Sequence, residues 1–98
     1  MNNNKKAYRY ITIDKIDKAW SLLKLEDNEE ANYMKGVLCE ENEKFGGSQK
    51  AIEFYKKVKY ISNAFHNHGT ILLTNDQYEE AIPLFERAIE LNPKHTKA

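Results

Sequence analysis

The chain has 98 residues, 41% of them hydrophobic and 31% charged, which is enough for one small domain. Fifteen basic residues balance fifteen acidic ones, and this zero net charge argues against a general nucleic-acid or membrane-surface binder. No membrane span is predicted, because no eighteen apolar residues run together, and the N-terminal residues are not followed by an apolar stretch that would predict a signal peptide. Cys39 is the single cysteine, which excludes an intrachain disulfide and favours a reducing, cytoplasmic location.

Frequent Ala, Leu, Glu and Lys, with only two prolines and four glycines, predict an all-α protein. Residues 1–11 are expected to form a polar, irregular lead-in. Five helices are predicted at residues 12–25, 28–44, 49–60, 63–74 and 77–91. Their expected N-caps are side chains of the capping type, namely Thr12, Asp27, Ser48, Ser62 and Asp76.

The last two predicted helices carry small and large apolar residues at regular offsets. Gly69 precedes Ala81 by twelve residues, and Phe85, Ala88 and Pro93 follow that alanine by four, seven and twelve. Small residues at fixed places let two helices approach closely, and a large ring fills the space beside them. The spacing over residues 62–95 resembles a tetratricopeptide repeat, a helical hairpin of about 34 residues.

Residues 28–61 fit the same pattern with an insertion. Gly36 takes the place of Gly69, while Ala51, Tyr55 and Val58 take the places of Ala81, Phe85 and Ala88. Gly36 and Ala51 are fifteen residues apart instead of twelve, so three extra residues are expected near residues 43–47 or in a longer second helix. Residues 12–27 are interpreted as the second helix of an incomplete leading repeat. The resemblance implies a right-handed αα-hairpin solenoid over residues 12–98, with roughly two repeats and a leading helix.

The resemblance also implies a non-enzymatic protein–protein interaction module, or scaffold. In this family the first helix of each repeat lines a concave groove for a peptide or helix. Matching positions here are Tyr33, Val37, Glu40, Asn63, His66, Thr70 and Leu73. Some members bind the C-terminal carboxylate of chaperones through a lysine and an asparagine four residues apart. Those places hold neither residue type here, so a chaperone-tail clamp is not predicted.

The last predicted helix has an apolar face around Ile82, Phe85 and Ile89, and the sequence ends where a further helix is expected. Helical repeats bury such faces against neighbours. A shortened gene, a lost capping helix and self-association through this face all stay open. The alternative functions are therefore a self-assembling structural unit and a fragment of a larger regulatory or sensor protein. Pro83 interrupts the backbone hydrogen bonds of this helix, and a bend away from the core is expected to absorb the cost.

Catalytic, metal and cofactor sites are not predicted. His66 and His68 are two residues apart on a helix, so they point in different directions and are interpreted as surface side chains. Cys39 lacks a local partner for nucleophilic catalysis and is expected to be buried or half-buried. The basic run at residues 56–60 is interpreted as an exposed helix face paired with Glu53.

Overall fold

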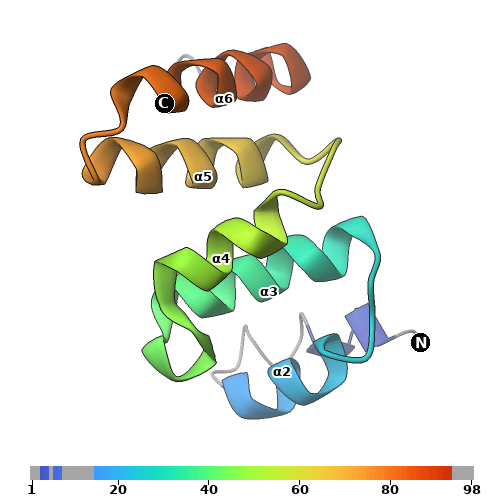
Figure 1. Ribbon diagram of the computed structural model, residues 1–98. Helices are drawn as coiled ribbons and strands as arrows, with labels where there is room; N and C mark the ends of the chain where they lie inside the picture. The colour runs from blue at the N-terminus through green and yellow to red at the C-terminus, as the bar shows by residue number, and fades with distance from the viewer. Residues whose placement is uncertain (1–2, 5, 8–14, 94–98) are drawn as a thin grey trace.

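The computed structural model describes residues 3–4, 6–7 and 15–93 of the chain. These residues contain α2 (Ile16–Leu23), α3 (Glu29–Glu41), the 3₁₀ helix η1 (Glu43–Phe45), α4 (Gly47–Tyr55), α5 (Ser62–Thr74) and α6 (Tyr78–Leu91). No strand occurs among them, which confirms the all-α class. The helices stack in chain order from α2 at one end to α6 at the other, within extents of 37 × 26 × 23 Å (Figure 1). None of the described helices is long and apolar enough to cross a bilayer.

Two helical hairpins make up most of this stack. α3 packs against α4, and α5 packs against α6, and these two pairs share the most extensive contacts in the molecule. Contacts from α2 to α3 and from α4 to α5 are smaller and join the layers. The arrangement is that of an αα-hairpin repeat fold, as the spacing of small and large residues predicts.

The same ring-on-glycine contact joins the helices of each hairpin. Gly36 of α3 lies against the ring of Tyr55, and Gly69 of α5 lies against the ring of Phe85. A Cβ built on Gly36 would overlap the tyrosine ring, and one on Gly69 would lie 3.0 Å from Cζ of Phe85. In both hairpins, the helices can approach this closely only because glycine has no side chain at the contact.

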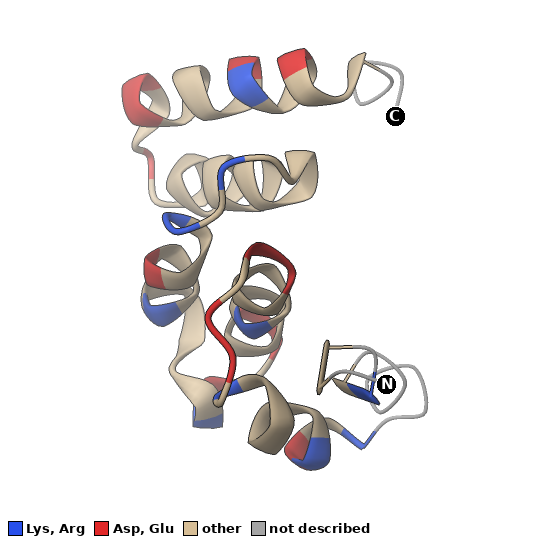
Figure 2. Cartoon of the chain, turned by 90° about the vertical axis from the view of Figure 1, so that its right-hand side faces the viewer, with Lys and Arg blue, Asp and Glu red and all other residues tan. Residues whose placement is uncertain are grey.

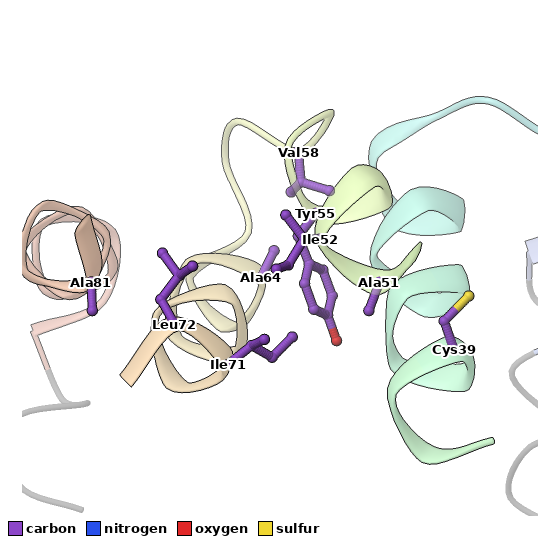
Figure 3. Packing of buried hydrophobic residues seen from close by; sticks show 9 residues of the cluster. All are labelled: Cys39, Ala51, Ile52, Tyr55, Val58, Ala64, Ile71, Leu72 and Ala81. Atoms are coloured by element: carbon purple, nitrogen blue, oxygen red, sulfur yellow. The ribbon is translucent and has the colours of Figure 1, made fainter. Parts of the chain in front are cut away.

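Two clusters of buried residues form the core. The larger runs from Cys39 on α3 to Ala81 on α6, with Tyr55 near its middle (Figure 3). The smaller joins α2 to α3 through residues that include Ala19, Leu23 and Leu38, all fully buried. Trp20 packs against both clusters, so the α2 layer is continuous with the rest of the core.

The predicted insertion near residues 43–47 forms η1 and the turn after it. Phe45 stacks on Trp20 of α2 with ring centroids 4.6 Å apart, and Lys44 forms a salt bridge of 2.8 Å with Asp17. Gly46 and Gly47 have φ values of 131° and 72°, which glycine adopts at little cost. The insertion thus leaves the hairpin contact intact and adds a side chain that holds α2.

Several helix ends differ from the sequence expectation. Asn28, one residue after the predicted Asp27, caps α3 by accepting a hydrogen bond from the Ala31 amide at 2.9 Å. Three other predicted caps are wrong, because α4, α5 and α6 have no side-chain cap. Ser48 lies inside α4, Ser62 donates to the Ala88 carbonyl, and Asp76 accepts from the Tyr78 hydroxyl. Thr12 lies outside the described residues.

The connection between the hairpins also departs from its prediction. α4 ends at Tyr55, so the basic run at 56–60 is not a helix face, and Glu53 pairs with Lys50 instead. The carboxylate of Glu29, at the start of α3, accepts hydrogen bonds from the Lys59 and Tyr60 amides at 2.8 and 2.9 Å. This capping of free amides fixes the segment that leads into α5.

The described residues of the lead-in are packed, in contrast to the expected irregular terminus. Residues 3–4 and 6–7 have helical backbone, and Ala7 is fully buried in the smaller cluster. Asn4 is also buried, and its side-chain amide donates a hydrogen bond to Oδ1 of Asn28. A polar segment can therefore be ordered when its amides reach a helix cap. The remaining lead-in residues, the start of the predicted first helix at 12–14 and the tail at 94–98 lie outside the described residues.

Substitution of Gly36 tests the ring-on-glycine contact. Gly36→Ala is expected to lower the free energy of unfolding by about 1–3 kcal/mol, because the added methyl group overlaps the Tyr55 ring. Urea unfolding followed by far-UV circular dichroism measures the change. The same substitution in a Tyr55→Leu background is the control, and there the loss is expected to be smaller. An equal loss in both backgrounds would show that the ring does not set the helix separation.

Candidate functional site

One exposed face of α5 contains the four side chains that the sequence places in a groove. Asn63, His66, Thr70 and Leu73 follow one another at intervals of three or four residues and are all exposed. We call these four residues the α5 stripe. The opposite faces of α5 pack against α4 and α6. The stripe is therefore an exposed, mostly uncharged helix surface.

The three groove candidates on α3 are less accessible. Tyr33 and Val37 are half-buried and pack against the larger core cluster, so they contribute to the packing of the fold. Glu40 is exposed, and its carboxylate accepts a hydrogen bond of 2.7 Å from the Tyr55 hydroxyl. These contacts divide the α3 candidates into two packed side chains and one available carboxylate.

Tyr55 connects the first helices of the two hairpins through its hydroxyl. It donates to Glu40 of α3 and accepts a hydrogen bond of 3.3 Å from the side-chain amide of Asn67 on α5. Burial first, and then the hydrogen bond to Glu40, raise the pKa of Tyr55 far above its ordinary value. The hydroxyl therefore stays protonated at physiological pH, and its two hydrogen bonds link the Glu40 carboxylate to Asn67 of α5.

A second free surface lies on α6. Tyr78, Ile82 and Ile89 share one face and are 54%, 57% and 40% exposed; we call them the α6 stripe. The third residue of the predicted face, Phe85, is placed differently. Its half-buried ring packs against Gly69 and lies edge-on to His66 at 5.6 Å. Phe85 thus belongs to the contact between α5 and α6.

Comparison with known families identifies the second hairpin. Residues 62–95 match the tetratricopeptide repeat family. The second hairpin is therefore similar to one tetratricopeptide repeat. No curated protein and no solved structure shows significant similarity to the chain. Repeats of this family are protein-interaction modules, so the hairpin indicates binding of another protein.

The residues that carry the resemblance occupy the inside of both hairpins. In the matched repeat, Ala81 and Ala88 are buried and Phe85 packs on Gly69, whereas Pro93 is exposed after the end of α6. In the first hairpin, buried Ala51 and the contact between Gly36 and Tyr55 take equivalent places. The packing is therefore repeated in residues 29–55, although the family match covers only 62–95. The division of the chain into two repeats remains our interpretation.

A cleft of about 380 Å³ lies between α4 and the matched repeat, on a face away from the α5 stripe. Ile52, Leu72 and Leu84 line it with His68, while Lys56 and Glu80 carry its charges. His68 is only 8% exposed, so its predicted surface position is wrong. Burial first and the neighbouring Lys56 second lower the pKa of His68. The cleft therefore favours a neutral imidazole.

Lys35 is a buried side chain that sequence reasoning missed. It is 5% exposed, donates a hydrogen bond of 2.6 Å to the Glu26 carbonyl and lies 5.0 Å from the centre of the Phe54 ring. Burial lowers its pKa, against the opposing charge of Asp27. Lys35 lies four residues after Ala31 and four before Cys39, so all three share one helix face. This spacing could have predicted that Lys35 is buried. Lys35 ties the turn before α3 to α4, and we assign it no role in binding.

Metal or thiol chemistry has little support in the described part of the chain. No group of three or more His, Cys, Asp or Glu side chains is placed there to hold a metal ion. Cys39 is fully buried, which confirms its predicted location. Burial raises the pKa of its thiol, and its Sγ lies 3.3 Å from the Phe45 carbonyl oxygen. The thiol is thus kept protonated and away from solvent.

The burial of His68 predicts a stability that depends on pH. Its pKa is lower in the folded chain than the ordinary histidine value of 6.5, so the unfolded chain binds the proton more tightly. The stabilisation is fully present above pH 6.5 and is lost as the pH falls below that value towards the folded pKa. Urea unfolding of the native chain between neutral and mildly acidic pH is expected to show this loss.

His68→Gln is expected to flatten the pH dependence, because glutamine does not titrate. The matched control is His66→Gln, which removes an exposed histidine from the same helix and is expected to retain the slope. The comparison separates His68 from the carboxylates, which both variants keep. An unchanged slope in His68→Gln would contradict the assignment.

Proposed function

We propose that this protein is a non-enzymatic interaction module that docks a peptide or a helix on the α5 stripe. The observation that carries the proposal is the exposure of Asn63, His66, Thr70 and Leu73 along one face of the matched repeat. The hydrogen-bonding groups of the stripe and the aliphatic Leu73 suit recognition of a mixed polar and apolar segment.

Glu40 adds a preference for a basic side chain in the ligand. Its carboxylate is exposed and oriented by the Tyr55 hydroxyl, and the α5 stripe itself contains no lysine, arginine or carboxylate. An arginine or lysine of the ligand would meet a pre-oriented acceptor there, which lowers the entropic cost of forming the contact. The half-buried Tyr33 and Val37 would border this contact with their exposed edges.

A second function, self-assembly through the α6 stripe, has its own support. Tyr78, Ile82 and Ile89 lie on one side of α6 at one end of a stacked fold, and each exposes 40% or more of its surface. Helical repeats bury such faces against a neighbour, and contiguous apolar surface on a small domain marks an interaction site. The chain would then act as a structural unit in a larger array or in a longer regulatory protein. We place both activities in a cytoplasmic setting, as the lone buried thiol suggests.

Binding to the α5 stripe is tested with a peptide selected from a random display library on the full chain. Leu73→Asp is expected to weaken binding about tenfold or more, because a carboxylate replaces the apolar centre of contact. Fluorescence polarisation of the labelled peptide measures the affinity. Tyr60→Ala is the control, since this exposed ring lies outside the stripe. Loss of binding in Ile82→Glu but not in Leu73→Asp would assign the peptide to α6 instead.

Stacking through α6 is tested by sedimentation velocity of the native chain over a range of concentrations. The native chain is expected to associate as its concentration rises, and Ile82→Glu is expected to keep it monomeric. Ile82 is exposed in the single chain, so a glutamate there should not disturb the fold. In a contact with a second molecule the same charge would be buried, and this weakens association. Tyr60→Glu places the same charge on an exposed residue away from α6 and should leave association intact. Monomeric native protein throughout would contradict this function.

A further inference from the structure

The two ends of the stack differ in charge, although the whole chain is neutral. α6 contains four glutamates and one arginine, whereas the segment 15–25 around α2 contains three lysines and one aspartate. α2 and α6 lie at opposite ends of the molecule (Figure 1). Figure 2 shows acidic residues along α6 and basic residues around α2. We call the α6 end acidic and the α2 end basic, although Glu26 and Asp27 directly follow the lysine-rich segment at the α2 end.

At the acidic end, charge and apolar surface lie side by side. Glu79 and Glu86 are exposed, and helical periodicity places them next to the α6 stripe, with Glu86 four residues after Ile82 and Glu79 three before it. Glu90, the next carboxylate along, is paired with Arg87 at 3.4 Å. A partner surface that covers the stripe must therefore tolerate or neutralise at least two carboxylates.

At the basic end, an open hollow of about 430 Å³ lies between Lys6 of the lead-in and α2. Lys6, Lys18, Ser21 and Leu22 line it, together with Asp17. Asp17 is already engaged by Lys44 at 2.8 Å, which reduces its repulsion of an incoming carboxylate. Leu25, just after the end of α2, is 71% exposed and adds an apolar side chain at this end of the molecule. We call Lys6, Lys18, Ser21, Leu22 and Leu25 the α2 acceptor face.

We propose that the α6 stripe of one copy docks on the α2 acceptor face of a second copy, so that molecules join head to tail. The inference rests on the second function proposed above, stacking through α6, and names the surface that receives it. Ile82 and Ile89 would cover Leu22 and Leu25, while Glu79 and Glu86 would approach Lys6 and Lys18. The contact joins two different surfaces, so each added copy leaves both kinds of end free, and the assembly grows as an open array.

Charge favours this arrangement over a symmetric pair. If two α6 stripes met each other, Glu79 and Glu86 of one copy would face the same carboxylates of the other, and like charges would repel. The head-to-tail contact replaces this repulsion with opposite charges. A zero net charge also leaves no overall repulsion between approaching copies. Association should therefore weaken as salt is raised, because exposed pairs are screened.

Two variants of the full chain test the proposal when they are mixed. The stripe-blocked variant carries Ile82→Glu and Ile89→Glu, and the acceptor-blocked variant carries Lys6→Glu and Lys18→Glu. All four positions are exposed, and circular dichroism verifies that each variant folds. Each variant alone is expected to stay monomeric in sedimentation velocity. Their mixture is expected to form a dimer that does not grow, because only one intact stripe and one intact acceptor face remain per pair.

Lys56→Glu with Lys59→Glu is the matched control, since it makes the same change of net charge at the α4–α5 connection. This control should associate as the native chain does. If the acceptor-blocked variant associates like the native chain, stacking through α6 stands but the head-to-tail contact is overturned. If the mixture stays monomeric while the native chain associates, the proposed pairing is likewise overturned. A native chain that never associates contradicts the stacking function itself.

Discussion

The close approach of a glycine to an aromatic ring is the constraint on which the rest of the structure depends. Gly36 lies on Tyr55 in the first hairpin and Gly69 lies on Phe85 in the second, and in each case the ring occupies the space of a side chain. This contact fixes the register of the two helices in each hairpin. Once register is fixed, the exposed side of α5 and the exposed side of α6 follow from helical periodicity. The two buried glycine–ring contacts therefore determine which helix faces are exposed for the proposed binding.

The first hairpin shows how strongly this contact constrains the chain. Three more residues separate glycine from ring there than in the matched repeat, yet the packing is the same. The extra residues lie between α3 and α4, where they form η1, and two glycines with positive φ follow it. Phe45 of η1 then stacks on Trp20 and holds α2 against the first hairpin. The additional residues between α3 and α4 therefore attach α2 to the first hairpin.

Spacing in the sequence was sufficient for the fold class, the two hairpins and the face of α5, because packing periodicity is local information. Helix ends were harder to predict. Asp27 and Asn28 are adjacent capping residues, and only the bond to the Ala31 amide distinguishes them. The segment after α4 is held by Glu29, thirty residues before the amide of Lys59 that it binds. His68 and Lys35 lie on the buried sides of their helices, so periodicity predicts their burial once polarity is disregarded. Phe85 was predicted both as the ring beside the small residues and as part of the apolar face of α6, and its half-buried ring packs on Gly69.

The position of Trp20 has a spectroscopic consequence. It is the chain's single tryptophan, and its ring lies between Phe45 at 4.6 Å and Phe54 at 6.0 Å, far along the chain from α5 and α6. Indole emission therefore reports on the α2 layer and the first hairpin, whereas helical ellipticity sums over every helix. In a repeat protein held together by nearest-neighbour contacts, the layers need not melt together. Superimposable melting curves from the two signals would mean that the molecule unfolds as one cooperative unit, and separated curves would reveal the order in which its layers come apart.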